Sequence, residues 1–215
     1  MIGGVDEAGR GCVLGPLVIG IAVAKESVAE GLLRHGVKDS KELTPKKREH
    51  LAVIVRKECG VLVLKIIAEE LNELMARHVS LNEIEAMRIA GGLMRLGEGV
   101  KRVYVDSPDT KSGKFEKRIR KYFDAPFELV CENKADANYP IVSAASIVAK
   151  VERDAEIGKI KKLVGYDFNS GYSSDPVTIA YLEKNLHNPA LQPYIRKEWK
   201  TITRMRHRKL NDFEA

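Results

Sequence analysis

The sequence predicts an α/β protein in which helices cover a mixed five-stranded sheet and a helical C-terminal extension follows. Three observations predict this class. Five apolar runs of strand length lie within residues 1–131, and only a short loop separates the first two. Helical patterns separate the later runs, and after the Gly/Ser/Asn-rich segment 165–175 only helical patterns continue. Strands joined partly by short loops and partly by helices are typical of a mixed sheet with helical layers.

The stretch Gly3-Gly4-Val5-Asp6-Glu7-Ala8-Gly9-Arg10-Gly11 contains the first strand and leads into the apolar run of residues 16–24, which forms the second. A short apolar entry followed by closely spaced glycines predicts a strand that ends in a tight loop. Asp6 and Glu7 therefore lie at a strand end. Because neighbouring strand residues point to opposite faces, the two carboxylates can meet at one site only if the pleat breaks where Ala8-Gly9 begins.

The glycines of this loop admit more than one interpretation. Gly9-x-Gly11-x-x-x-Gly15 is close to a dinucleotide-binding pattern, but that pattern requires a helix next, and residues 16–23 have strand composition. We interpret Gly9-Arg10-Gly11 as an open backbone surface that can approach a phosphate or sugar, with a guanidinium between the glycines. The alternative is a solvated hairpin turn with a surface arginine.

The middle of the chain alternates between helical and strand patterns. Thr44-Pro45 supplies an N-cap and a first-turn proline for a helix that ends near residue 59. A later helix opens with the capping box Ser80-x-x-Glu83. The remaining periodic segments are helices at 28–35, 69–76, 80–96, 114–122, 139–163 and 176–186, and strands at 61–67, 100–106 and 127–131.

Two further features concern organisation. The long helix 139–163 has a first half rich in small apolar residues, which permits tight packing on a sheet. The segment after residue 187 is broken by prolines, then basic, then acidic. We expect an α/β domain at residues 1–170 and a helical C-terminal extension with a basic tail at residues 171–215.

Composition narrows the class of protein. The 215 residues are 44% hydrophobic and 31% charged, as in ordinary globular proteins, and suffice for one well-buried core or two small ones. The net charge of +6 favours a polyanionic partner such as nucleic acid.

The cysteines and the hydropathy pattern bear on the cellular compartment. Cys12, Cys59 and Cys131 form no CxxC pair and no Cys/His cluster at zinc spacing, which favours reduced thiols. No signal peptide pattern opens the chain, and no apolar run is long enough to span a bilayer. We therefore expect a soluble cytoplasmic protein.

Four acids lie at or just past the ends of predicted strands: Asp6, Glu7, Asp106 and Asp136. Taken singly, each is more often a turn or cap residue than a ligand. Together, they would concentrate negative charge that only cations could neutralise. Oxygen ligands without His or Cys suit Mg²⁺ or Mn²⁺, and two such ions can support phosphodiester cleavage.

Several motifs occur in a fixed order along the chain. They are Asp6-Glu7-Ala8-Gly9-Arg10-Gly11 with Gly15-Pro16-Leu17-Val18, Asp39-Ser40-Lys41, Val105-Asp106-Ser107, Lys134-Ala135-Asp136 with Val142-Ser143-Ala144-Ala145-Ser146-Ile147-Val148-Ala149-Lys150, and Gly171-Tyr172-x-Ser174-Asp175-Pro176. In this order they resemble ribonuclease HII, the type 2 ribonuclease H family. The later Trp199-Lys200-Thr201 is similar to its archaeal branch.

The resemblance implies a ribonuclease H-like fold and an activity. The family cuts RNA strands of RNA/DNA hybrids and single ribonucleotides embedded in duplex DNA. The catalytic and metal-binding acids would be Asp6, Glu7, Asp106 and Asp136, with two divalent ions, Mg²⁺ or Mn²⁺. The resemblance also implies substrate contacts by Gly9, Arg10 and Gly11, stacking of Tyr172 at the ribose, and a phosphate contact by Lys41.

Two other functions stay open at this point. One is a divalent-metal nuclease of other specificity. The other is a non-catalytic nucleic-acid-binding protein on the same fold, although four retained acids argue against it because carboxylates repel phosphate unless metal bridges them.

The tail contains a partial docking motif. The spacing His207-x-x-Leu210-x-x-Phe213 resembles the peptide by which replication proteins bind a sliding clamp, with His in place of the usual Gln and one aromatic instead of two. Leu210 and Phe213 would share one face of a helical turn and could fill an apolar pocket. The alternative is a tail that folds back or frays. We expect the protein itself to be a monomer.

Overall fold

The computed structural model of the chain describes residues 1–37, 43–111 and 113–211, the last four as backbone only. Contacts between residues divide these into two compact units. Unit 1 comprises Met1–Ala8, Val18–Lys65 and Leu81–Glu152, and unit 2 comprises Gly9–Leu17, Ile66–Ser80 and Arg153–Ala215. Both units are assembled from segments distant in sequence. The domain boundary expected between residues 170 and 171 stays a prediction.

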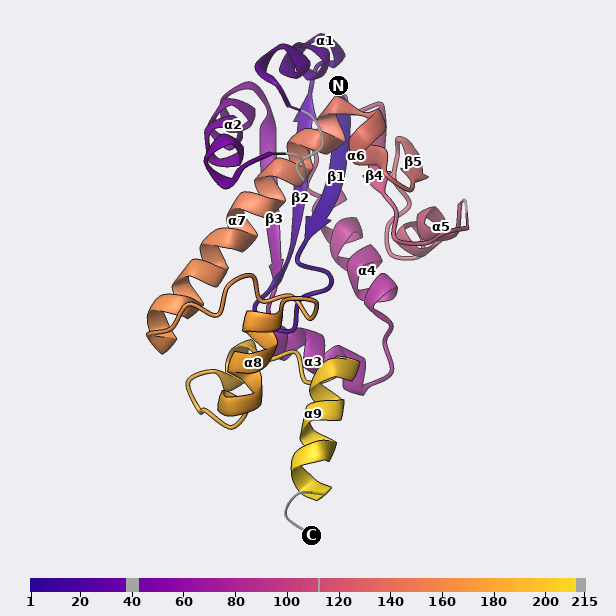
Figure 1. The fold of residues 1–215 in the computed structure, drawn as a ribbon. Helices are drawn as coiled ribbons and strands as arrows, with labels where there is room; N and C mark the ends of the chain where they lie inside the picture. Colours follow the sequence, from indigo (N-terminus) through magenta and orange to yellow (C-terminus); the bar gives the residue numbers. More distant parts are fainter. Residues whose placement is uncertain (38–42, 112, 212–215) are drawn as a thin grey trace. The chain divides into compact units, whose positions relative to one another are not determined.

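The sheet has five strands in the order β3-β2-β1-β4-β5 (Figure 1). β1 pairs antiparallel with β2 and parallel with β4, and β4 pairs parallel with β5. The predicted mixed five-stranded sheet is therefore confirmed. The strand bounds are β1 Ile2–Ala8, β2 Leu17–Ala24, β3 Gly60–Ile66, β4 Arg102–Asp106 and β5 Glu128–Glu132.

One face of the sheet is covered by the first half of α7 (Pro140–Val164). A Cβ at Gly4 would overlap the carbonyl oxygen of Ile141, and a Cβ at Gly20 would overlap that of Ala145. The helix backbone therefore lies almost directly on β1 and β2. This confirms the tight packing predicted from the small residues of the helix, several of which are fully buried.

The opposite face of the sheet is covered by α4 (Leu81–Leu93). Ile21 follows Gly20 in β2 and so points away from α7, and a Cβ at Gly92 of α4 would lie 2.5 Å from its Cδ1 atom. α5 (Lys114–Arg120) packs beside α4 and buries Phe115 and Ile119. The sheet in unit 1 thus has a helical layer on each side.

The remaining helices of unit 1 mostly follow the predicted segments: α1 (Glu26–Gly31), the 3-10 helix η1 (Leu32–His35) and α2 (Pro45–Glu58). Thr44 caps α2 as predicted, since its Oγ1 atom accepts a hydrogen bond from the Lys47 amide at 3.4 Å. Asp136 lies just past the end of β5, as predicted, and there it is part of a short helix, α6 (Ala135–Asn138).

Unit 2 is built mainly from helices: α3 (Ala68–Ala76), the end of α7, α8 (Pro176–Asn185), the 3-10 helix η3 (Gln192–Tyr194) and α9 (Lys200–Asn211). They surround a core that includes Leu14, Phe168 and Ile202. Asp175 caps α8 by accepting hydrogen bonds from the amides of Val177 and Thr178. Among the described residues, no helix combines the length and apolar composition needed to cross a bilayer.

Candidate active site

Three of the predicted acids converge at one end of the sheet in unit 1. The parallel ladder between β1 and β4 ends at the pair Val5–Val105, and Asp6 and Asp106 come directly after it. One carboxylate oxygen from each of Asp6, Glu7 and Asp106 lies within 4.8 Å of the other two. The end of the parallel ladder therefore brings together acids that are about 100 residues apart in the chain.

Asp6 and Glu7 reach this point although they are neighbours in a strand. β1 stays paired with β2 as far as Ala8, so the pleat continues through both acids. The chain turns only at Gly9, whose φ angle is +85°. Asp6 shares the α7 side of the sheet with Gly4, so Glu7 begins on the opposite side. The two carboxylates meet because they lie at the end of the strand, where the longer glutamate side chain can reach across.

The environment of Asp6 is that of a carboxylate crowded by others. Its side chain is only 6% exposed. Burial, followed by the negative charge of Asp106, raises the pKa of Asp6 to about 7, and Asp136 acts in the same direction. A hydrogen bond with Ser146 and one from the Glu7 amide act in the opposite direction. Oxygen-only donors that repel one another fit a hard divalent cation, which would favour their ionised forms.

Asp136 lies near this cluster but not within its closest group. It is 2% exposed, and its charge contributes to the raised pKa of Asp6. The turn that precedes it requires a left-handed Lys134, with φ of +59°. This turn directs the amide of Ala135 toward Asp106, where it donates to Oδ1 at 2.9 Å. The segment that carries Asp136 is thus hydrogen-bonded to the neighbouring acid.

Ser146 is a site residue to which the sequence analysis assigned no role. It lies on α7, is 5% exposed and hydrogen-bonds Asp6. Ser143, one turn earlier, is also buried and donates to the carbonyl oxygen of Asp136. The sequence did contain a sign of these roles: two serines three residues apart in an apolar helical segment. Buried hydroxyls need hydrogen-bond partners.

The predicted substrate-binding residues Gly9, Arg10, Gly11 and Tyr172 all belong to unit 2. Gly9 cannot be replaced without strain, since its φ is positive and a Cβ would lie 2.9 Å from the Pro16 carbonyl oxygen. The carbonyl of Gly11 accepts a hydrogen bond from Ser173 Oγ at 3.3 Å. Cys12 and Tyr172 form a β-bridge. The glycine loop and the tyrosine are therefore adjacent.

Two buried arginines support this loop, and the sequence analysis missed both. Arg153 is 2% exposed and donates to Cys12 Sγ at 2.8 Å and to the Ser170 carbonyl. Arg196 is fully buried and donates to the carbonyls of Gly15 at 2.9 Å and Arg10 at 3.1 Å. The available signal for Arg153 was its position four residues after Ala149 on the apolar stripe of α7. Lys41 lies outside the described residues.

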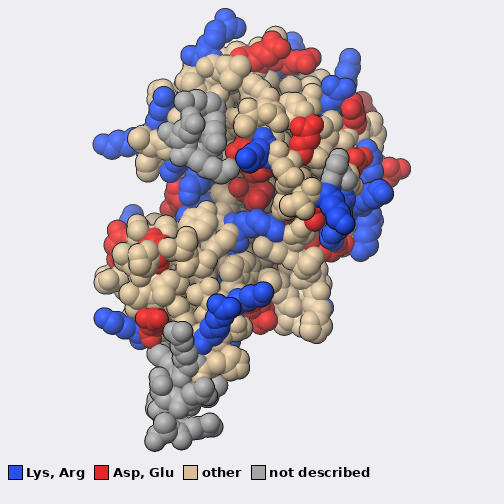
Figure 2. Space-filling model, turned by 45° about the vertical axis from the view of Figure 1, so that its right-hand side comes forward, with Lys and Arg blue, Asp and Glu red and all other residues tan. Residues whose placement is uncertain are grey.

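The charges on one face of the molecule are mixed. Figure 2 shows a face made mostly of uncharged residues, with Lys and Arg side chains in scattered groups and Asp and Glu side chains among them. On this face, therefore, basic and acidic groups are not separated into patches of one sign.

Known proteins resemble this chain over nearly its full length. The family model for ribonuclease HII matches residues 3–202. A ribonuclease HII from Methanoregula boonei is 43% identical over 205 residues, which covers 94% of this chain and 93% of the relative. The crystal structure of ribonuclease H2 from Pyrococcus horikoshii superposes with a TM-score of 0.84 at 42% identity, covering 96% of this chain and 97% of that one.

A further solved structure, the PCNA:RNase HII complex from Archaeoglobus fulgidus, has a TM-score of 0.86 at 40% identity and covers 99% of this chain and 100% of that one. The mixed sheet, its helices and these likenesses define a ribonuclease H-like fold, and the carboxylate cluster suits a metal-dependent nuclease. The chain belongs to the ribonuclease HII family, and it is a ribonuclease H enzyme.

Proposed function

We propose that the protein is an endoribonuclease that cuts the RNA strand of RNA/DNA hybrids and also cuts duplex DNA at single embedded ribonucleotides. Hydrolysis would use two divalent cations, Mg²⁺ or Mn²⁺. The observation that carries this proposal is the convergence of Asp6, Glu7 and Asp106, whose oxygens lie within 4.8 Å of one another. Such a group is unfavourable in a metal-free protein and favourable around cations.

Each acid has a role that its position supports. Asp6, the buried acid of the cluster, would hold the cations together with the half-buried Glu7 and Asp106, and Asp136 would be a fourth ligand. When bound, divalent cations supply activation of water and stabilisation of charge on the phosphate and on the leaving oxygen. Ser146 and the Ala135 amide orient Asp6 and Asp106 by hydrogen bonds.

Recognition of the ribonucleotide would rest on the loop of residues 9–11 and on Tyr172, all in unit 2. Gly9 and Gly11 leave the backbone open to a sugar or phosphate, and Arg10 supplies a cation between them. Tyr172 would stack against the ribose that carries the 2′-hydroxyl, which is the group that distinguishes RNA from DNA. Lys41 would contact a phosphate. The net charge of +6 adds sequence-independent attraction to the duplex.

A cleavage assay tests the proposal directly. The protein is incubated with Mg²⁺ or Mn²⁺ and three labelled duplexes: an RNA/DNA hybrid, DNA with one ribonucleotide, and all-DNA. We expect cleavage of the first two and not of the third. Cleavage of all-DNA at a comparable rate would instead indicate a nuclease of other specificity, and binding without cleavage would indicate a non-catalytic protein.

We further propose that the tail docks on a sliding clamp. The solved structure of the A. fulgidus relative is a complex with PCNA. In this chain, α9 extends to Asn211, so Leu210 lies at the end of a helix, and Phe213 is outside the described residues. Deleting residues 210–215 should abolish binding to the clamp of the same organism, as measured by calorimetry, and leave oligonucleotide cleavage unchanged. Undiminished clamp binding after the deletion would contradict the idea.

A further inference from the structure

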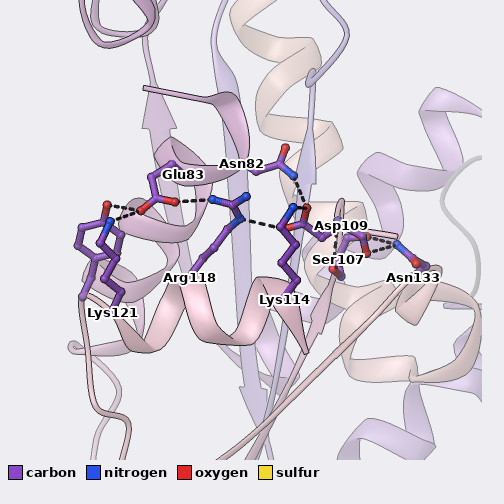
Figure 3. A network of polar contacts seen from close by, with 9 residues as sticks. Asn82, Glu83, Ser107, Asp109, Lys114, Arg118, Lys121 and Asn133 are labelled. Carbon is purple, nitrogen blue, oxygen red and sulfur yellow. Dashed lines mark hydrogen bonds and ion pairs between the residues drawn. The ribbon is translucent and has the colours of Figure 1, made fainter. Parts of the chain in front are cut away.

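A network of polar contacts holds the segment that follows β4, directly after Asp106 (Figure 3). The segment consists of Ser107, Pro108 and Asp109. Ser107 Oγ accepts a hydrogen bond from the Asp109 amide at 3.2 Å, which closes a small turn. The Asp109 side chain is 9% exposed, so its charge depends on protein groups for stabilisation.

Asp109 is bound from α4 and α5. Arg118 Nε donates to its Oδ2 atom at 3.0 Å, and Asn82 Nδ2 donates to its Oδ1 atom at 2.9 Å. Lys114 lies further away, with its Nζ atom 3.7 Å from Oδ1. The turn after Asp106 is therefore attached through a buried carboxylate to the helical layer, and not only through the strand.

Arg118 is itself fixed in place by Glu83. Its Nη1 atom donates to Glu83 Oε2 at 2.6 Å while its Nε atom donates to Asp109. The other oxygen of Glu83 accepts from Lys121 Nζ at 2.8 Å and Tyr122 Oη at 2.6 Å. Arg118 thus joins two acids, and its guanidinium fork has a defined orientation.

Asn133 binds the same turn from the other side. Its Nδ2 atom donates to the carbonyl oxygen of Ser107 and, at 3.2 Å, to that of Asp109. Asn133 directly follows β5 and lies three residues before Asp136. Its contacts therefore tie the segment that carries Asp136 to the segment that follows Asp106, in addition to the 2.9 Å bond from the Ala135 amide to Asp106.

We propose that Asp109, Arg118 and Asn133 are positioning residues that hold Asp106 and Asp136 at the spacing needed for cation binding. The inference rests on the proposed function, since it concerns the same acids. Carboxylates that repel one another move apart unless the backbone resists. Bonds on both sides of the Ser107–Asp109 turn provide that resistance, and outer groups of this kind commonly change metal affinity by about 10–100-fold when removed.

The test compares two variants with a matched control. Asn133→Ala removes the side-chain tie between the two acid-bearing segments and leaves the Ala135 bond in place. Arg118→Met removes the link between Asp109 and Glu83 while keeping an unbranched apolar side chain. Arg102→Ala is the control, because Arg102 and Glu128 join the same strands, β4 and β5, at their opposite ends with a 2.6 Å bond. Calorimetric titration with Mn²⁺ alone measures affinity without reference to catalysis.

We expect the Mn²⁺ dissociation constant to rise about tenfold in Asn133→Ala and in Arg118→Met and to stay unchanged in Arg102→Ala. At saturating Mn²⁺, kcat should recover in the two positioning variants, with KM for the hybrid unchanged. Unchanged Mn²⁺ affinity in a folded Asn133→Ala protein would overturn the proposal. If Arg118→Met unfolds, Arg118→Lys replaces it, since lysine keeps the cation but lacks the two separate nitrogens that bind Asp109 and Glu83.

Asp106→Asn separates this inference from the proposed function. If Asp106→Asn weakens Mn²⁺ binding and Asn133→Ala does not, the acids are ligands and the positioning role is wrong. If Asp106→Asn also binds Mn²⁺ and cleaves normally, the proposed site itself is wrong.

Discussion

The guanidinium carbon of Arg153 lies 4.6 Å from the centre of the Tyr172 ring, so a buried cation supports the aromatic residue proposed to contact the ribose. Such a stack contributes on the order of 1–2 kcal/mol when it is shielded from water. Arg153 also holds the Ser170 carbonyl and Cys12, which flank the tyrosine and the glycine loop. The orientation of Tyr172 therefore depends on a residue of α7.

Tyr172→Ala should lower kcat/KM at a single ribonucleotide more than it lowers affinity for duplex. Stacking contributes locally, on the order of 1–3 kcal/mol, whereas affinity for duplex rests mainly on phosphate contacts. Cleavage rates are compared on single-ribonucleotide and all-RNA substrates. An unchanged ratio of the two rates would refute the assignment.

Arg153→Met should shift the same ratio in the same direction, because the tyrosine loses its support. Lys161→Met is the control: Lys161 Nζ lies 5.9 Å from the Phe168 ring centre in the same unit, but Phe168 belongs to the core. If Arg153→Met folds and keeps the wild-type ratio of the two cleavage rates, Tyr172 needs no such support.

Asp106→Asn should remove most cleavage without lowering the melting temperature of the metal-free protein. The change keeps the side-chain shape and deletes a charge that raises the pKa of Asp6. Removing that repulsion compensates for the loss of an ionised partner for the Ala135 amide. Cleavage and thermal unfolding in chelator are the measurements. Near-normal cleavage under Mg²⁺ would mean that Asp106 does not hold metal.

Two adjacent glycines of α4 should respond in opposite ways to alanine. A Cβ at Gly91 would meet no atom of the described residues within 4 Å, apart from its own helix backbone and chain neighbours. A Cβ at Gly92 would lie 2.5 Å from Ile21 and 2.9 Å from Leu64. Gly91→Ala should stabilise the protein by about 0.5–1 kcal/mol through helix propensity. Gly92→Ala should destabilise it by roughly 1–3 kcal/mol through overpacking against the sheet. Urea unfolding measures the change in the free energy of unfolding for each variant. Equal changes in the two variants would contradict the packing of α4.

Glu83 should make stability depend on pH in the acid range. Hydrogen bonds from Lys121 and Tyr122, with a further one from Arg118, lower the pKa of Glu83 from 4.5 to about 2. Because the pKa of Glu83 is lower in the folded state, ionised Glu83 stabilises the fold fully above the unfolded pKa of 4.5. This stabilisation is lost as pH falls toward 2.

Urea unfolding of wild type and Glu83→Gln tests this. The wild type should be more stable by roughly 1–3 kcal/mol near neutral pH, and the difference should shrink as pH falls below 4.5. Glu73→Gln is the control, since its pair with Arg77 is largely exposed and should matter little. A difference that is constant across pH would contradict the shifted pKa.

The local patterns of the sequence were sufficient to predict most elements of the fold. Strand and helix periods, the Thr44 cap and the small residues of α7 act over a few residues, and the structure agrees with each. The ordered motifs also predicted the family. These signals depend on propensities and sterics between near neighbours, which a single chain displays directly.

The spacing of the acids was decided only by the tertiary structure. Asp6 and Asp106 meet because β1 pairs with β4, a choice made by the sheet as a whole. Tertiary structure also decided the stacking of Arg153 on Tyr172 and the bond from Asn133 to the Asp109 carbonyl. In the sequence, each of the two is an ordinary polar residue. Arg153 binds Cys12, 141 residues away, and Asn133 binds the carbonyl of Ser107, 26 residues away. Such contacts follow from packing, because local propensity carries no information about which distant segment will be adjacent.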